Sequence, residues 1–371
     1  RAGDTAKAIA DYNRAIEIEP KFAGGYTGLG NTYSDMNERD KAIAAHSKAI
    51  DANPKYALAY SNRGLVFADK GDYDSAIADY TKALSIDSEY ATAYANRGWS
   101  YHAKKEYDKA ISDYSRAISL NSKDAWSFNA RGDVYRAKGE FDKAIADYSR
   151  AIELVPGKAS YVNNRGVAYQ RKGDLDRAIS EYTRATEIDR KYAVAFSNLG
   201  DAMKSKGDLD TAIAHYSKAL ELYPKHVPYI TSLGYAHFYN GNFKESAAVM
   251  LRAIEIADDV YPMLFRYLAR ARAGEAAAKD ELEANATRLK TKAWPFAAIE
   301  LLLGKRSAAA TLDAATNADE KCEAHFYIGE WHLLKDNRVE AAPSLKAAAE
   351  TCPKTFVESI AAIAELKRMN R

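Results

Sequence analysis

The feature that most constrains the fold is a strict 34-residue period. Glycine recurs at this step without an insertion, at Gly30, Gly64, Gly98, Gly132, Gly166, Gly200 and Gly234. Two alanine series and one largely tyrosine series keep the same step, starting from Ala8, Ala15 and Tyr12. A fixed period of this length is the signature of repeat architectures, in which each unit packs on its neighbours. The sequence therefore predicts an array of similar units that share a continuous core.

The unit over residues 57–90 shows how each repeat folds. Its first half carries residues spaced by four and three on one helical face, at Tyr60, Gly64 and Phe67. Gly71 then stands where a first helix ends. The second half carries a small inner face with one large residue, at Ala76, Tyr80 and Ala83. Each unit is therefore predicted to be a pair of antiparallel helices.

The period and the pattern Y-x-x-x-G-x-x-Y … A-x-x-x-Y-x-x-A resemble the tetratricopeptide repeat (TPR) family. The likeness covers residues 1–260: a half repeat at 1–22, which resembles a second helix, and seven complete repeats over 23–260. It implies an all-α fold, a right-handed solenoid whose concave face is lined by the first helices. It also implies that sequence upstream of Arg1 is missing.

The period ends near Asp258, and residues 261–371 are expected to be helical but irregular. We expect a helix pair at 261–274 and 275–290, then two short helices near 295–303 and 307–316. A further TPR-like unit follows at 322–353, out of phase with the others, and a capping helix at 355–369.

This region resembles the C-terminal part of the NlpI-like bacterial lipoproteins. The resemblance rests on HFYIGEWHLL at 325–334, on FVESIAAIAEL at 356–366, and on the series Ala341, Leu345 and Ala348. It implies a non-enzymatic periplasmic adaptor that is anchored in the outer membrane, forms a homodimer and joins a protease to cell-wall hydrolases. A lipid-anchor cysteine would lie upstream of Arg1. The N-terminal solenoid is longer than in that family, which leaves the dimer and the partner open.

Composition and motifs narrow the function classes. Lys+Arg 53 against Asp+Glu 51 gives a net charge of +2, which argues against a nucleic-acid binder. The chain contains no nucleophile, metalloprotease, Walker or dinucleotide motif, and its carboxylates are expected at solvated helix positions. We therefore expect no catalytic residue, no cofactor and no metal site.

One position predicts ion pairs inside the repeats. The residue before the repeat glycine is arginine in four units, and each has an acidic residue sixteen positions later, as Arg63/Asp79, Arg97/Asp113, Arg131/Asp147 and Arg165/Glu181. The other three units have Leu29, Leu199 and Leu233, followed by Ala45, His215 and Val249. Because arginine occurs only with an acid, we predict a partly buried structural ion pair in each of the four units. Independent surface charges are the alternative.

Cys322 and Cys352 would begin and end the helix pair of the last TPR-like unit, so their side chains should be neighbours. A disulfide is one prediction and would suit the periplasm; two free thiols in a reducing compartment are the other. A metal site with His325 is the weaker interpretation, because His325 stands where repeats place an aromatic core residue.

The concave face carries the best signal for binding. An asparagine stands one position before the arginine or leucine, at Asn62, Asn96, Asn164 and Asn198. An amide offers both a donor and an acceptor, so a row of asparagines can hold the backbone of an extended peptide. The row resembles the asparagine ladder of the TPR domain of O-linked N-acetylglucosamine transferases. Neighbouring candidates for the same groove are Trp99, Asp133, Arg136, Gln170 and Lys204.

These observations predict a protein-interaction scaffold in the bacterial cell envelope that binds a protein or peptide in its groove. The expected location is the periplasm, with the cytoplasm as alternative. Two other functions stay open: the recognition arm of a larger enzyme whose catalytic domain lies outside this chain, or a cytoplasmic assembly factor.

Overall fold

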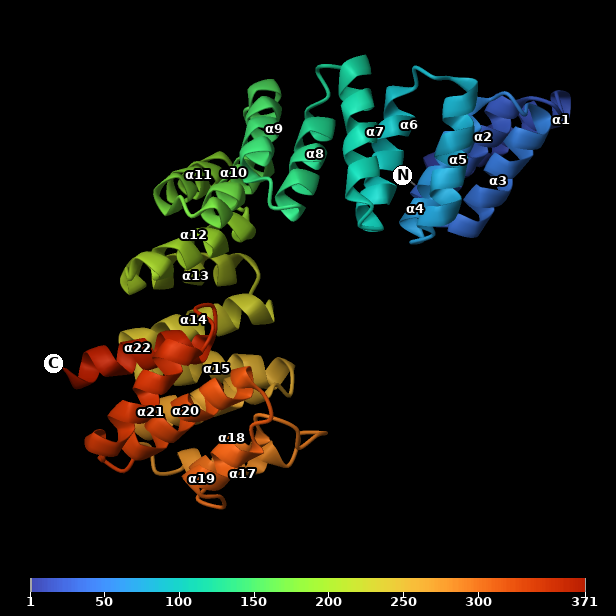
Figure 1. Cartoon of the computed structure of the whole chain (residues 1–371). Coiled ribbons are helices and arrows are strands. Elements are labelled where there is room, and N and C mark those ends of the chain that lie inside the picture. The colour runs from blue at the N-terminus through green and yellow to red at the C-terminus, as the bar shows by residue number, and fades with distance from the viewer. Residues whose placement is uncertain (1, 371) are drawn as a thin grey trace. The chain divides into compact units, whose positions relative to one another are not determined.

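In the computed structural model, residues 2–370 are described, and over these residues the chain forms 22 α-helices and no β-strand (Figure 1). The helices group into two compact units, residues 1–184 and 185–371, which we call the N-terminal and C-terminal units. The boundary falls inside α11 (Leu175–Ile188). The all-α solenoid class expected from the 34-residue period is confirmed.

The N-terminal unit is a run of helix pairs whose lengths hardly vary. Its helices are α1 (Ala2–Ile18), α2 (Ala23–Asp35), α3 (Arg39–Ala52), α4 (Ala57–Asp69), α5 (Tyr73–Ile86), α6 (Ala91–Ala103), α7 (Tyr107–Leu120), α8 (Ala125–Ala137), α9 (Phe141–Leu154) and α10 (Ala159–Lys172). Even-numbered helices are the first helices of the repeats, and odd-numbered helices are the second.

The C-terminal unit begins with two regular pairs, α12 (Ala193–Lys206) with α13 (Leu209–Leu222), and α14 (Val227–Asn240) with α15 (Phe243–Ile256). Less regular helices follow, α16 (Val260–Arg272), α17 (Ala278–Ala286), α18 (Phe296–Leu302) and α19 (Ala308–Ala314). The unit ends with the pair α20 (Ala318–Leu333) and α21 (Arg338–Thr351), and with α22 (Val357–Met369).

The repeat glycine and tyrosine make the close packing inside each pair. Tyr148 is fully buried, and a Cβ added at Gly132 would lie 2.8 Å from the Tyr148 Cε1 atom. The first helix can therefore approach the tyrosine ring only where it has no side chain. Gly71, at the end of a first helix, has φ +82°, which a glycine adopts without strain.

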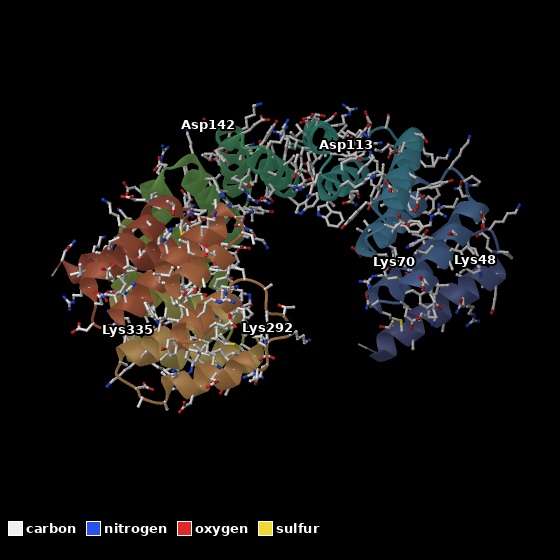
Figure 2. The ribbon with its side chains drawn as sticks, turned by 60° about the horizontal axis from the view of Figure 1, so that its bottom comes forward. Lys48, Lys70, Asp113, Asp142, Lys292 and Lys335 are labelled. Atoms are coloured by element: carbon white, nitrogen blue, oxygen red, sulfur yellow. A yellow bond between two sulfur atoms is a disulfide. The ribbon has the colours of Figure 1, made fainter. Side chains whose placement is uncertain are left out.

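A ladder of exposed ion pairs joins consecutive repeats. A lysine at the end of each of four first helices, α4, α6, α8 and α10, contacts an aspartate of the preceding repeat, as Lys70–Asp40, Lys104–Asp74, Lys138–Asp108 and Lys172–Asp142. Lys70 and Asp142 are labelled among the side chains of Figure 2. Water and salt screen such exposed pairs, so each contributes little to stability. Their constant spacing nevertheless gives every repeat in this run the same contact with its neighbour.

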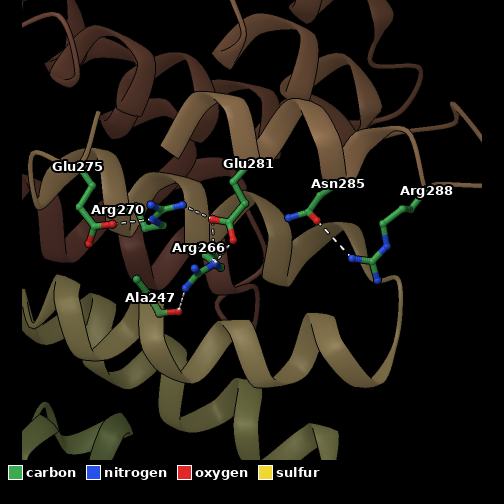
Figure 3. A network of polar contacts seen from close by, with 7 residues as sticks. All are labelled: Ala247, Arg266, Arg270, Glu275, Glu281, Asn285 and Arg288. Atoms are coloured by element: carbon green, nitrogen blue, oxygen red, sulfur yellow. Dashed lines mark hydrogen bonds and ion pairs between the residues drawn. The ribbon is translucent and has the colours of Figure 1, made fainter. Parts of the chain in front are cut away.

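In the irregular region, α17 is shorter than the predicted helix at 275–290. Glu275 lies before the helix and contacts Arg270 of α16, while Arg266 and Arg270 converge on Glu281 of α17 (Figure 3). The helix ends by Thr287, whose hydroxyl bonds to the Ala284 carbonyl. These contacts hold the short helix α17 against α16.

The C-terminal unit closes on itself through α22. Its core contains aromatic rings from three helices. The ring centroid of Phe265 lies 5.1 Å from that of Phe238 and 5.7 Å from that of Phe326. Helix α22 packs on α21 and also contacts α14. Arg368 donates to the backbone carbonyl of Tyr239 at 2.7 Å, and the Tyr239 hydroxyl donates to the backbone carbonyl of Val357 at 3.3 Å. The capping helix therefore also holds a helix that precedes it by more than a hundred residues.

Candidate functional site

All four arginine–acid pairs of the sequence pattern are present within the N-terminal unit. In three of them the arginine donates from Nε and Nη2 to both oxygens of its aspartate at 2.7–2.8 Å, as Arg63–Asp79, Arg97–Asp113 and Arg131–Asp147. Arg165 makes a single bond of 2.7 Å to Glu181, and its Nε has no partner. The alternative of independent surface charges is therefore wrong.

The two members of each arginine–aspartate pair differ in depth. Asp113, labelled in Figure 2, is only 6% exposed, and Asp79 and Asp147 are buried to a similar degree, so the aspartates are the deeper members of these partly buried pairs. Asp113 also contradicts the expectation that carboxylates stand at solvated positions. The reason is geometric, because the guanidinium covers both oxygens of the short aspartate. Glu181, held through one oxygen, is half-buried as predicted.

The arginine members keep part of their side chains in contact with solvent. Arg97 is 17% exposed and Arg63 is 22% exposed, so the predicted partial burial is confirmed for them. The hydrogen bond with Asp113 raises the pKa of Arg97, and the bond with Asp79 does the same for Arg63. The three arginine–aspartate pairs thus place the acid in the repeat core and the base at its edge.

Each of these arginines also reaches the preceding repeat. The Nη1 atom donates to a hydroxyl sixteen residues earlier, at Ser47 for Arg63, Thr81 for Arg97, Ser115 for Arg131 and Ser149 for Arg165. The distances are 2.8–3.0 Å. One guanidinium thus joins its own helix pair and the second helix before it. The sequence pattern contained this hydroxyl, but only the pairing with the acid was recognised.

Adjacent first helices of the N-terminal unit share a polar face through asparagine side chains. The Asn62 amide donates to the Asn31 side chain at 2.9 Å, from α4 to α2. The Asn164 amide donates to the Asn129 side chain at 3.0 Å, from α10 to α8. Two predicted ladder residues therefore each donate one hydrogen bond to a neighbouring asparagine, and both residues are half-exposed.

We call this surface the first-helix face; it carries large apolar residues as well as the amides. Leu65 is 45% exposed and Trp99 is 38% exposed, and both occupy the repeat position three residues after the asparagine. Trp126, which is 41% exposed, stands at the start of α8. Asn96 of α6 is half-exposed. Sequence reasoning found Trp99 but missed Leu65, which stands at the same repeat position, and Trp126.

Three predicted face residues of the N-terminal unit hydrogen-bond to core tyrosines. Asp133 accepts from the Tyr148 hydroxyl at 2.8 Å, and Arg136 donates to the same hydroxyl at 3.2 Å and to Asp133 at 3.1 Å. Gln170 accepts from the Tyr182 hydroxyl at 2.7 Å. These side chains are half-buried and serve the repeat core as well as the surface.

The C-terminal unit repeats this arrangement once. Asp201 accepts from the Tyr216 hydroxyl at 2.7 Å and from Lys204 at 2.9 Å. Lys204 also lines a pocket of about 640 Å³ with Ile360 and Ile363 of α22. Asn198 is half-exposed on α12.

The hydroxyls of Tyr80 and Tyr114 are buried without a partner. The positions that supply Asp133 and Arg136 to Tyr148 hold Leu65 and Ala68 near Tyr80, and Trp99 and His102 near Tyr114. Burial raises the pKa of both phenols far above its usual value. These two repeats therefore lack the acidic and basic side chains that bind the tyrosine hydroxyl at Tyr148.

This difference predicts opposite outcomes for the same substitution. Tyr80→Phe removes a hydroxyl that has no partner, so the free energy of unfolding should stay unchanged or rise slightly. Tyr148→Phe removes the donor to Asp133 and should lower it by about 1 kcal/mol. Urea denaturation of both variants measures the difference, and an equal loss in both would contradict this assignment of partners.

Cys322 and Cys352 form a disulfide that joins the start of α20 to the end of α21, with Cα atoms 5.1 Å apart. His325 is half-buried and not in the core, because Cys322 and Phe326 occupy the inward face of α20.

None of the helices in the described part of the chain combines the length and the apolar character that a membrane-spanning helix requires.

The expectation that carboxylates keep to solvated positions is also wrong for the C-terminal unit. Glu330 of α20 and Glu365 of α22 are fully buried, and Arg272 of α16 lies 3.3 Å from the first and 3.0 Å from the second. Burial and repulsion from Glu365 raise the pKa of Glu330 to about 8. No repeat pattern marks these residues, because their partner lies outside the period.

Successive helix pairs of nearly constant length, each packed around its own small residues and tyrosine, define a helical-repeat protein. Models of the TPR repeat match residues 1–37, 30–71, 64–105 and 132–173, and further tetratricopeptide repeat models match 91–124, 159–225 and 197–262. Together these ranges cover more than half of the chain, which therefore belongs to the tetratricopeptide repeat family. Proteins of this family generally bind protein or peptide partners, and they are typically scaffolds without catalytic activity.

Solved structures share the fold at low sequence identity. The Cut9–Hcn1 hetero-tetramer of APC/C is 18% identical, with 71% of this chain and 52% of that chain covered and a TM-score of 0.52. A tetratricopeptide repeat protein from Parabacteroides merdae is 19% identical, with 62% and 92% covered and a TM-score of 0.50. YrrB, described as a TPR protein with an unusual peptide-binding site, is 27% identical, with 50% and 95% covered and a TM-score of 0.43. No curated protein matches the sequence.

Proposed function

We propose that this protein is a non-enzymatic adaptor that binds an extended segment of a partner protein along the first-helix face of its N-terminal unit. The observation that carries the proposal is the row of exposed side chains on consecutive first helices, with Leu65 on α4, Trp99 on α6 and Trp126 on α8. Exposed aromatic residues of this size are typical anchors of protein interfaces.

The amides beside these anchors supply the polar part of the site. Asn62, Asn96 and Asn164 are half-exposed on α4, α6 and α10, and the Asn62 and Asn164 carbonyls can accept from a peptide N–H. A partner segment would place apolar side chains on Leu65 and Trp99 and its backbone beside the amides. Asp133, Arg136 and Gln170 follow on α8 and α10. Asn198 and Lys204 offer the same groups on the C-terminal unit.

We further propose that the adaptor acts in the bacterial periplasm, attached to the outer membrane through a lipid anchor upstream of Arg1, as in NlpI-like lipoproteins. The Cys322–Cys352 disulfide supports an oxidising compartment. A periplasmic protease or cell-wall hydrolase would be its partner, and a homodimer its assembly.

Affinity capture from a cell-envelope extract tests the binding face. The quadruple variant Asn62→Ala, Asn96→Ala, Leu65→Ala, Trp99→Ala should lose about 10-fold or more of each specifically captured protein. The matched control replaces exposed lysines of second helices, Lys48→Ala with Lys82→Ala, and should retain binding. If both variants capture the same amount of partner protein, the binding site does not lie on this face.

The compartment is tested separately, by fractionation and by thiol labelling in intact cells. We expect the full-length protein in the outer-membrane fraction, with Cys322 and Cys352 unreactive until a reductant is added. A cytoplasmic protein with two reactive thiols would contradict the periplasmic assignment and leave the binding face untouched.

A further inference from the structure

A second surface, in the C-terminal unit, has a chemistry unlike that of the first-helix face. A pocket of about 480 Å³ lies where the starts of α14, α16 and α22 meet the side of α20. Three carboxylates line it, Asp259, Glu323 and Glu358, together with the rings of Tyr235, Tyr261 and Phe356. Its remaining lining residues are Val227, Pro228, Thr231 and Val357. We call it the acidic aromatic pocket.

The two inner carboxylates are nearly buried and have only uncharged hydrogen-bond donors. Glu323 is 7% exposed and accepts from the Trp294 indole N–H at 2.9 Å and from the Tyr261 hydroxyl at 3.1 Å. Glu358 is 2% exposed and accepts from the Tyr327 hydroxyl at 2.9 Å. The walls of the pocket are thus fixed by hydrogen bonds before any ligand arrives.

These acids have no basic partner in the part of the chain that the structure describes. Among the residues that the structure describes, none of the three carboxylates forms an ion pair, and the pocket lining contains no lysine, arginine or histidine. Helix starts favour Asp259 and Glu358, which lie at the N-cap of α16 and in the first turn of α22, but Glu323 lies farther along α20. Burial raises the pKa of Glu358 to about 8 with a contribution from Glu323, and burial likewise raises the pKa of Glu323.

We propose that the acidic aromatic pocket binds an arginine side chain presented by a partner protein. A guanidinium can donate to two carboxylates at once and lay its flat face on a tyrosine or phenylalanine ring. Its charge would stabilise the ionised forms of Glu323 and Glu358, which have no counter-ion among the described residues. This pocket is separate from the first-helix face, so either binding proposal can be contradicted without affecting the other.

Titration of the full chain with blocked tripeptides tests the proposal. The probe is acetyl-Gly-Arg-Gly-amide, and its uncharged match replaces arginine by citrulline. Methyl NMR of labelled valines reports the site directly, because Val227 and Val357 line the pocket. We expect the arginine peptide to shift both signals and to bind about 10-fold or more tightly than the citrulline peptide.

Isosteric variants separate charge from fold. Glu323→Gln and Glu358→Gln keep an oxygen for the Trp294 and Tyr327 donors, and each should weaken arginine binding by about 10-fold. Glu350→Gln changes an exposed carboxylate of α21 and should leave affinity unchanged. Circular dichroism establishes that each variant is folded. Equal affinity for the citrulline peptide, or unchanged affinity in both pocket variants, would overturn the proposal.

Discussion

The variant Arg131→Leu should lower the free energy of unfolding by about 3 kcal/mol, and the double variant Arg131→Leu, Asp147→Ala should recover most of that loss. The single change leaves the buried Asp147 carboxylate without its two 2.8 Å hydrogen bonds from the guanidinium. Removing one member of a buried pair is costly, whereas replacing both members by apolar residues is often nearly neutral. The chain already contains the apolar version, since Leu29 and Ala45 occupy these two positions in its first complete repeat.

Urea denaturation followed by circular dichroism measures both variants. Arg150→Leu is the matched control: it removes an arginine whose pair with Glu153 is exposed on α9, and it should cost less than about 1 kcal/mol. A loss in Arg131→Leu no larger than in this control would mean that the pair behaves as a surface pair. Failure of Asp147→Ala to rescue the fold would instead assign the loss to the arginine's bond with Ser115.

Reduction of the disulfide should lower the stability of the C-terminal unit by about 3–4 kcal/mol. Cys322 and Cys352 are 30 residues apart in sequence, and a cross-link that closes a loop of this length restricts the unfolded chain. The measurement is thermal or urea unfolding with and without a reductant. The transition of the C-terminal unit should move, and that of the N-terminal unit should stay in place.

The double variant Cys322→Ser, Cys352→Ser provides the control for this experiment. It should unfold like the reduced wild-type protein and should be insensitive to the reductant. If the oxidised and reduced wild-type proteins unfold at the same denaturant concentration, the cross-link does not contribute to stability. If mass spectrometry finds two free thiols before reduction, the disulfide itself is contradicted.

The sequence predicted the local parts of this fold because they repeat. The period placed the helix pair α4 and α5 within the expected unit at 57–90, and covariation between Arg63 and Asp79 anticipated a contact between two helices. Lys70 and Asp40 also recur at the same step, but their pairing was not predicted. Each of these contacts spans at most 30 residues, so repetition marks it many times over.

The depth of a repeated contact is harder to predict than its existence. The pairing of Arg97 with Asp113 follows from the period, but the near-complete burial of Asp113 follows from the way two guanidinium donors enclose one carboxylate. For the candidate site, the period likewise gave the positions of Asn62 and Trp99, whereas the exposure of Leu65 emerges only from the packed helices.

The contacts that were missed altogether occur once. Arg368 reaches the Tyr239 carbonyl across 129 residues, and Arg272 reaches Glu330 across 58. No second copy of either pair exists for comparison within the described part of the chain. The residue type alone does not tell whether a glutamate is buried or exposed, so the composition could not identify Glu330 as buried.

The third hydrogen bond of each repeat arginine has a consequence for how the chain opens. Arg63, Arg97, Arg131 and Arg165 each hold a hydroxyl of the repeat before them, so neighbouring repeats are coupled four times in succession. In a linear array, stability is the sum of each repeat's own stability and of the interfaces between neighbours. Strengthening consecutive interfaces lengthens the stretch that must melt together. Amide protons in α4 to α10 should therefore exchange with solvent in one concerted opening, and not repeat by repeat from an end.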